Sequence, residues 1–281
     1  MVDWYSSEMH AGEVPVSDRG FQYGDGLFET IAIRNGEMRL WQYHMDRLQR
    51  GCERLDIRMP AAAELSAGVM HALRQSDVPD TYGVAKIIVS AGSSARGYGR
   101  VSAASPTVLF GVFPAFPLAV ELYRDGVDTT LCETRLAVNS PIAGIKTLNR
   151  LEQVLARSEF VDSGQFEGLT MDADDNIICG TMSNVFFVTQ NTLSTPPLHR
   201  CGVEGVMRRH IMATLKNHGI DTLFRNTTVD ELRTVDEVFV VNSQFGLLPV
   251  RTCSDLSWPV GNTTREVMAL LANNGIAECR L

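Results

Sequence analysis

The 281-residue sequence predicts an α+β protein built of two domains. Three observations support this. In the first hundred-odd residues β-rich runs alternate with amphipathic helical segments, while the second half is dominated by a meander of short β runs. Between them, "PAFPLA" breaks the regular pattern with two prolines. We therefore expect a small N-terminal domain of residues 1–113, a linker of residues 114–119 and a larger C-terminal domain of residues 120–281.

The N-terminal half reads as a sheet with at least one helix. "LFETIAIRNGEMRLW" predicts two strands around an Asn-Gly turn, which is a strong hairpin signal. "QYHMDRLQRGCERLDI" follows with apolar residues at helical spacing, which predicts an amphipathic helix. Two further strands are expected in "YGVAKIIVSAG" and "TVLFGVF". The loop between these strands, "SSARGYGRVSAAS", is rich in glycine and serine.

The C-terminal half has a different pattern of expected strands and helices. A strand is expected at 127–132, and a helix from about residue 147 carries an apolar stripe. A meander of short strands follows, punctuated by turn residues. Another helix is expected at roughly 204–218, followed by a strand in "EVFVVNS". The stripe of the first helix consists of Leu148, Leu151, Val154, Leu155 and Val161.

Charge and cysteine content exclude several classes of protein. The net charge is −8 with a pI of about 5.3 and no basic block, so neither nucleic acid nor an anionic membrane is an expected partner. The six cysteines are scattered without a CxxC pair, which favours a reducing compartment. The histidines lack metal-ligand spacing, and neither G-x-S-x-G nor G-x-G-x-x-G occurs. With no secretory signal in "MVDWYSSEMH" and no apolar run long enough to span a bilayer, we expect a soluble, cytoplasmic protein.

One lysine stands out. The chain has three lysines among its 25 basic residues, and Lys146 follows the apolar stretch "SPIAGI" just before an expected helix. Burial and the positive end of a helix dipole both disfavour the ammonium form, as a nucleophilic lysine requires. The alternative is a solvated lysine near a helix start.

Three other stretches offer weaker candidates. Gly205 enters the helix expected at 204–218, and free amides at such an end bind phosphate. Thr30 lies on a strand that is apolar on its other face, so its hydroxyl needs a partner, either a neighbouring carbonyl or a substrate. Arg96 and Arg100 on the glycine-rich loop suit a carboxylate, although a solvent-exposed hairpin tip would look the same.

Five segments taken together resemble a known family. "DRGFQYGDGLFET", "HMDRL", "GIKTLNRLEQVLARSE", "GTMSNVFFV" and "GVMRRHI" resemble, in order and over nearly the whole chain, the fold type IV pyridoxal-phosphate (PLP) enzymes. This group contains branched-chain and D-amino-acid aminotransferases and aminodeoxychorismate lyase. The resemblance implies a two-domain fold of the D-amino-acid aminotransferase type, with PLP in the cleft between the domains, and a homodimer.

The resemblance also assigns residues to the cofactor. Lys146 matches the lysine that forms a Schiff base with PLP, and Arg47 matches the arginine that holds its phosphate. The backbone of Val206 and Met207 after Gly205 matches the phosphate cup, and Ser243 falls where a hydroxyl residue also contacts the phosphate.

Within the family the chain most resembles the lyases. "GIKTLNRLEQVL" is close to their lysine segment, and "RGY" resembles their glycine-rich loop. Thr30 and Asn242 match a catalytic threonine and an asparagine of the lyases, and Tyr23 and Arg96 are further candidates for substrate binding. The resemblance thus implies conversion of 4-amino-4-deoxychorismate to 4-aminobenzoate and pyruvate. A D-amino-acid or branched-chain aminotransferase is the alternative, ahead of a catalytically silent relative that binds a phosphorylated ligand.

One position departs from the family pattern. Where a glutamate usually contacts the pyridine nitrogen of PLP, this sequence has Cys179. A neutral thiol is a weak hydrogen-bonding partner and cannot stabilise a pyridinium as a carboxylate does. Either another group replaces the glutamate, or the reaction needs a weaker electron sink, as a lyase that forms an aromatic ring would.

Overall fold

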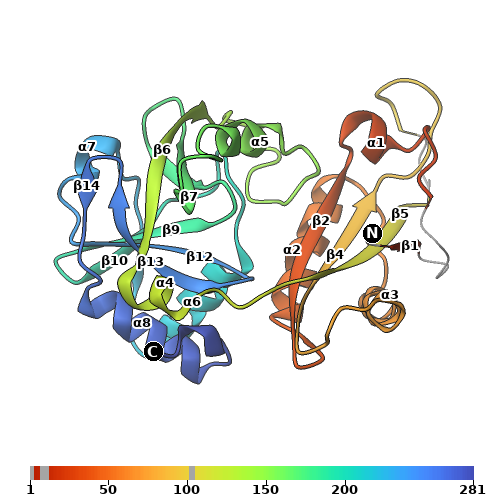
Figure 1. Ribbon diagram of the computed structural model, residues 1–281. Coiled ribbons are helices and arrows are strands. Elements are labelled where there is room, and N and C mark those ends of the chain that lie inside the picture. Colours follow the sequence, from red (N-terminus) through yellow and green to blue (C-terminus); the bar gives the residue numbers. More distant parts are fainter. Residues whose placement is uncertain (1–2, 7–12, 101–104) are drawn as a thin grey trace. The chain divides into compact units, whose positions relative to one another are not determined.

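A computed structural model describes residues 3–6, 13–100 and 105–281 and confirms the predicted α+β class (Figure 1). The chain forms two compact units. Unit 1 comprises Met1–Phe116 together with Ile145–Asn149, and unit 2 comprises Pro117–Gly144 and Arg150–Leu281. The chain first passes from one unit to the other within the segment 114–119. Unlike the division expected from the sequence, residues 145–149 group with the first unit.

Unit 1 contains an antiparallel sheet in the order β1-β5-β4-β2-β3. The expected hairpin forms, with the left-handed residues Asn35 and Gly36 at its turn. The strands are β1 (Trp4–Ser6), β2 (Gly26–Arg34), β3 (Glu37–Met38), β4 (Tyr82–Ser90) and β5 (Thr107–Pro114), and the helices are α1 (Arg19–Tyr23), α2 (Trp41–Arg54) and α3 (Ala62–Gln75).

The two faces of this sheet differ. On one face, Leu27 and Ile31 of β2 and Ile87 of β4 are buried under α2 and α3. Side chains alternate along a strand, so Phe28 and Thr30 lie on the opposite face, where they are only half-buried. The register pairs Thr30 with Lys86 of β4 on that same face. Chemistry-bearing side chains therefore gather on the half-open face.

Unit 2 is built on a nine-stranded mixed sheet in the order β11-β10-β9-β12-β13-β6-β7-β8, with β14 paired to β13. Its strands are β6 (Val127–Arg135), β7 (Glu167–Met171), β8 (Ile177–Gly180), β9 (Asn184–Thr189), β10 (Thr192–Thr195), β11 (Thr222–Phe224), β12 (Glu237–Asn242), β13 (Gly246–Cys253) and β14 (Leu256–Ser257). Its helices are α4 (Val120–Asp125), α5 (Leu151–Ser158), α6 (Val206–Asn217), α7 (Val229–Leu232) and α8 (Asn262–Asn273), with a 3₁₀ turn at Ala277–Cys279.

Helices cover this sheet in two groups. α6 and α8 pack against each other and against β12, while α5 contacts β6 and β7. The buried phenylalanines Phe186 of β9 and Phe239 of β12 stack with their centroids 5.0 Å apart, which fills the centre of the core. Within the described parts of the chain, no helix has the length and apolar character needed to cross a membrane.

The segment that contains Lys146 is extended rather than helical. The amide of Phe28 donates to the carbonyl of Lys146 at 3.0 Å, and the amide of Leu148 donates to the carbonyl of Gly26 at 2.9 Å. These bonds add residues 145–149 to the edge of β2. The expectation of a helix from about residue 147 is therefore wrong: α5 begins at Leu151, and Lys146 does not adjoin its N-terminus.

The expected apolar stripe extends past the end of α5 and is largely exposed. Leu151, Val154, Leu155 and Val161 are all more than half exposed, whereas Ala156 is buried. The pattern correctly indicated a helix, but its larger apolar side chains point away from the core of unit 2.

Candidate active site

Lys146 lies over the aromatic ring of Phe28. Its Nζ is 4.3 Å from the ring centroid, and the Nζ of Lys86 is 5.0 Å from the same centroid. Ile145 and Thr147 on either side are buried, while Lys146 itself is half-buried. Burial lowers the pKa of Lys86 from its ordinary value. Phe28 thus places two amines on the face of the sheet that carries Thr30.

Arg47 is held by a buried carboxylate. It lies on α2 and donates from Nε to Glu29 Oε1 at 2.8 Å and from Nη2 to Glu29 Oε2 at 2.5 Å. His44, one turn earlier, contacts Glu29 Oε2 through Nδ1 at 2.6 Å. Glu29 belongs to the apolar face of β2, so all three groups are buried between strand and helix. A bidentate pair of this kind fixes the plane of the guanidinium.

The pKa values of this cluster reflect burial and charge. Burial by itself would raise the pKa of Glu29, but Arg47 and His44 outweigh it and lower that pKa to about 2. Burial lowers the pKa of His44, the positive charges of Arg47 and Lys146 act in the same direction, and Glu29 opposes them. Among the described residues nothing bonds to His44 Nε2, which suits a neutral ring that donates from Nδ1. At neutral pH we therefore assign a carboxylate, a neutral imidazole and a guanidinium.

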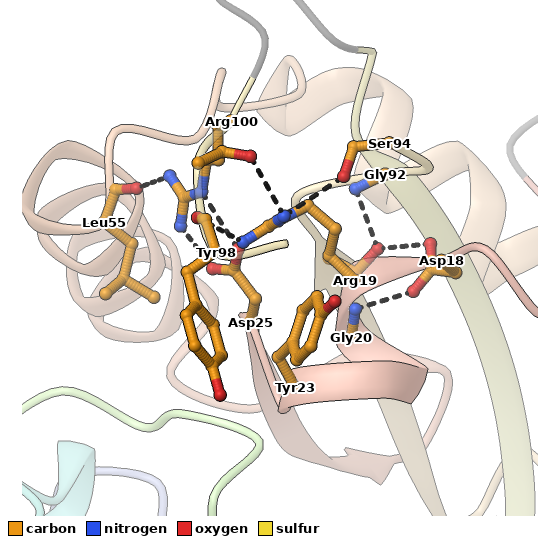
Figure 2. Close-up of polar contacts among 12 residues, drawn as sticks. Asp18, Arg19, Gly20, Tyr23, Asp25, Leu55, Gly92, Ser94, Tyr98 and Arg100 are labelled. Atoms are coloured by element: carbon orange, nitrogen blue, oxygen red, sulfur yellow. Dashed lines mark hydrogen bonds and ion pairs between the residues drawn. The ribbon is translucent and has the colours of Figure 1, made fainter. Parts of the chain in front are cut away.

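The glycine-rich loop carries one exposed arginine and one that is bound internally. Arg96 is exposed, whereas Arg100 donates to both carboxylate oxygens of Asp25 (Figure 2). Tyr23 accepts a hydrogen bond from the amide of Gly97 at 3.3 Å. Of the two arginines predicted to suit a carboxylate, Arg96 remains the candidate and Arg100 supports the loop.

In unit 2, the N-terminus of α6 forms a tight cradle. Gly205 is its N-cap and has no side chain with which to cap the first-turn amides of Val206 and Met207. Asn184 accepts from the amide of Gly205 at 2.9 Å and donates to the carbonyl of Val203 at 2.9 Å. A Cβ added at Gly205 would lie 2.0 Å from Asn184 Oδ1, so a side chain does not fit.

Asn242 and Ser243 lie at the end of β12. Asn242 Oδ1 accepts from the amides of Gln244 and Phe245 at 2.8 and 3.0 Å, and its Nδ2 donates to the carbonyl of Met182 at 3.4 Å. These bonds shape the turn that presents Ser243. In this structure Asn242 organises the backbone of this turn, a role that the sequence did not suggest.

Cys179 lies on β8 in a buried apolar cluster with Leu136, Leu198 and Cys201 among others. Burial raises the pKa of the Cys179 thiol to about 11, so the thiol is neutral at physiological pH. The carboxylate of Glu167 on the adjacent strand β7 is also buried, but its oxygens accept from the turn that follows β8. That turn supplies the Thr181 amide and hydroxyl, the Met182 amide and the Ser183 hydroxyl.

Sequence reasoning missed Glu29, Asn184 and Lys86. Glu29 carried a signal, because a carboxylate between Leu27 and Ile31 on an apolar strand face must find a partner. Asn184 and Lys86 offered less, since their importance depends on contacts with residues far away in the sequence. Of the predicted residues, Lys146, Thr30, Arg47, Tyr23 and Arg96 belong to unit 1, and Cys179, Gly205, Val206, Met207, Asn242 and Ser243 belong to unit 2.

Residues 26–253 match the family Amino-transferase class IV, and the chain therefore belongs to this family, whose fold type IV members depend on PLP. The chain is 34% identical to an aminodeoxychorismate lyase of Vibrio harveyi over 92% of this chain and 95% of that protein. The crystal structure of 4-amino-4-deoxychorismate lyase from Pseudomonas aeruginosa superimposes with a TM-score of 0.90 at 41% identity, covering 97% of this chain and 99% of that one. A putative branched-chain-amino-acid aminotransferase of Methanocaldococcus jannaschii is 30% identical over 85% of this chain and 82% of that protein. The predicted family resemblance is confirmed.

The residues present suit PLP. Lys146, whose Nζ lies over the Phe28 ring, supplies the amine that the aldehyde of PLP requires. In unit 1 Arg47, oriented by Glu29, is a donor of the kind that binds phosphate, and in unit 2 so are the first-turn amides after Gly205. The cradle at Gly205 leaves no room for a side chain, as expected of a backbone site that a phosphate approaches closely.

Proposed function

We propose that this chain is a PLP-dependent lyase that converts 4-amino-4-deoxychorismate into 4-aminobenzoate and pyruvate, a step toward folate. The observation that carries the proposal is the 41% identity with a lyase structure over nearly the entire chain. The placement of Thr30 and Phe28 on one strand face, with Lys146 over that ring, supports it.

By the family resemblance, Lys146 would attach the cofactor covalently. Arg47 and the amides of Val206 and Met207 would bind its phosphate, and the Ser243 hydroxyl would add a further contact. When bound, PLP withdraws electrons from the carbon that bears the substrate amine.

The chain's own residues then move the protons. Lys146 would act as the general base that accepts the proton from the amine-bearing ring carbon. Thr30 gives or relays a proton to the enolpyruvyl oxygen as its bond to the ring breaks. The ring becomes aromatic and the enolpyruvyl group leaves as pyruvate. Arg96 binds one of the two substrate carboxylates.

Cys179 is compatible with a reaction that does not require a carboxylate to stabilise a protonated pyridine nitrogen. Its thiol is neutral, and the buried carboxylate of the neighbouring strand, Glu167, is engaged by the turn at 181–183. Because aromatisation supplies driving force, we propose that the lyase works without a carboxylate at this position. A large acceleration of 4-aminobenzoate formation by Cys179→Glu would overturn this.

The decisive assay measures 4-aminobenzoate and pyruvate formed from chorismate, glutamine and the synthase that makes the substrate. We expect the wild-type protein to form both products in equal amounts. Lys146→Ala should abolish turnover and the visible absorbance of the bound cofactor, and Lys216→Ala, near the end of α6, is the matched control. Thr30→Gly should slow product formation while cofactor remains bound. Unchanged activity of Lys146→Ala would refute the assignment.

An aminotransferase remains the second candidate because of the M. jannaschii relative. Incubation with PLP, a panel of D- and branched-chain amino acids and a keto acid separates the two. Amino transfer without 4-aminobenzoate formation would replace the lyase proposal.

We also propose that the chain acts as a cytoplasmic homodimer. All six cysteines are buried free thiols, which suits a reducing compartment. The exposed apolar residues of α5 and Val161 form a surface that a second copy would cover. Light scattering should give a dimer for the wild type and a monomer for Leu155→Glu. A wild-type monomer would overturn the dimer.

A further inference from the structure

The glycine-rich loop is fixed by a buried arginine that precedes it by some 75 residues. The guanidinium of Arg19, 4% exposed, donates from Nη1 to Ser94 Oγ at 3.1 Å and to the carbonyl of Gly97 at 3.0 Å (Figure 2). Its Nη2 donates to the carbonyl of Tyr98 at 2.9 Å. These bonds hold the Ser94 side chain before Arg96 and the backbone carbonyls of Gly97 and Tyr98 after it, while the side chain of Arg96 stays exposed.

The base of the loop is fixed by the residue before Arg19. Asp18 is buried and accepts from the hydroxyls of Ser90 and Thr107, each at 2.7 Å, which ties α1 to the ends of β4 and β5. The backbone amide of Arg19 donates to the carbonyl of Gly92 at 2.9 Å. The loop therefore leaves the sheet at a fixed point.

The far end of the loop is held by a second arginine through a shared carboxylate. Asp25, in the Gly-Asp-Gly turn before β2, accepts from Arg19 Nε at 2.7 Å and from Arg100 Nε at 2.9 Å. Arg100 also donates to the carbonyls of Leu55 and Asp56, just after α2, the helix that carries Arg47 (Figure 2). Burial would raise the pKa of Asp25, but Arg100 and Arg19 outweigh it and lower that pKa, so Asp25 stays charged.

Tyr23 completes the support. Arg19 lies over its ring with Cζ 5.0 Å from the centroid, and the Tyr98 ring lies 5.5 Å away from it, centroid to centroid. The guanidinium of Arg19 thus packs against the Tyr23 ring while its N–H groups donate to the loop.

We propose that Arg19, Asp25 and Arg100 are positioning residues that hold loop 93–100 in the conformation in which Arg96 meets a substrate carboxylate. This rests on the lyase function proposed above. A loop with two glycines in four residues would otherwise lose backbone conformational entropy at each residue when it becomes ordered around the substrate. Because the clamp orders the loop beforehand, that cost does not reduce affinity for the substrate.

The test removes the negative charge of Asp25 while keeping the size and shape of its side chain. In Asp25→Asn we expect KM for 4-amino-4-deoxychorismate to rise about tenfold, since charge-assisted bonds are lost, while kcat changes less than about twofold. Arg100→Gln should do the same, with Arg100→Lys intermediate because it keeps the charge but not the fork. Trypsin cleavage after Arg96, followed by mass spectrometry, reports the freedom of the loop without reference to activity, and should be faster in Asp25→Asn and Arg100→Gln.

The matched control is Asp128→Asn in unit 2, where Asp128 accepts a bidentate contact from Arg251 at 2.7 and 2.6 Å. It should leave both KM and cleavage after Arg96 unchanged. Faster cleavage without a change in KM would overturn the positioning role, and unchanged cleavage would overturn the clamp.

Failure of the lyase function would show itself separately, because the wild type would form no 4-aminobenzoate. The role assigned to Arg96 in binding a substrate carboxylate would then also be wrong. The cleavage comparison would still decide whether Asp25 holds the loop.

Discussion

The two units hold their candidate site residues in place by different physical means. In unit 1 the supports are charge pairs: Glu29 orients Arg47, and Asp25 joins Arg19 to Arg100. In unit 2 the support of Gly205 is uncharged and steric, because the Asn184 amide group fixes Gly205 and leaves no room for a side chain there. The first kind fails when a charge is removed or neutralised, and the second when an atom is added.

The largest effect is expected from Glu29→Gln. It leaves the buried Arg47 cation uncompensated, and breaking such a pair costs about 3–5 kcal/mol. Urea unfolding should show a loss of that size, together with weaker PLP binding in a titration followed by absorbance. Glu37→Gln, at an exposed position of β3 in the same hairpin, should be neutral. Equal stability of the two variants would contradict the charge-pair account.

A smaller effect is expected from Gly205→Ala. The added methyl cannot coexist with Asn184 Oδ1, so the hydrogen bond from the Gly205 amide to this oxygen is lost. An amide left without its partner costs about 1–3 kcal/mol. PLP affinity, measured by equilibrium dialysis, should fall by roughly 10- to 100-fold. In an Asn184→Ala background the same glycine change should cost little more. If it costs as much as in the wild type, the clash with Asn184 is not the cause.

The smallest effect is a pH dependence from His44. Its folded-state pKa lies below 6.5, so below pH 6.5 the unfolded chain takes up a proton that the folded chain does not. Stability should therefore fall with decreasing pH, by at most about 1.4 kcal/mol per pH unit. Glu29 does not contribute to this slope, because its stabilisation is lost only below pH 4.5, toward its folded pKa of about 2.

Urea unfolding at pH 5, 6 and 7 measures this slope. His44→Asn, whose amide still donates toward Glu29, should flatten it, and His199→Asn at an exposed position should not. An unchanged slope in His44→Asn would assign the dependence to other groups.

The sequence predicted the fold correctly where neighbouring residues alone determine the local structure. The Asn35-Gly36 turn takes two left-handed residues, which that dipeptide readily adopts, and the hairpin was placed correctly. Non-local pairing caused the failures. No local period reveals that Lys146 and Leu148 bond to the edge of β2, so the helix was expected four residues too early. The stripe on α5 revealed an apolar face, but a single sequence does not say what covers that face.

The same limit applied to the site. Lys146 and Arg47 could be assigned from motifs, whereas the groups that orient them could not, since Glu29 meets Arg47 across a strand and a helix. Arg100 was a candidate partner for a carboxylate beside Arg96, and the structure shows it bound to Asp25, 75 residues earlier.

The chain crosses between the two units three times, and this constrains when each part of the protein can assemble during synthesis. A ribosome that has released residues 1–116 has delivered every strand of the five-stranded sheet, but not the lysine that docks on its edge. Residues 117–144 must emerge before Lys146 can reach β2. A truncated chain ending at Phe116 would therefore contain Glu29, Arg47 and Lys86 but lack Lys146, and nascent chains should become able to bind PLP covalently through Lys146 only after residue 149 has left the exit tunnel.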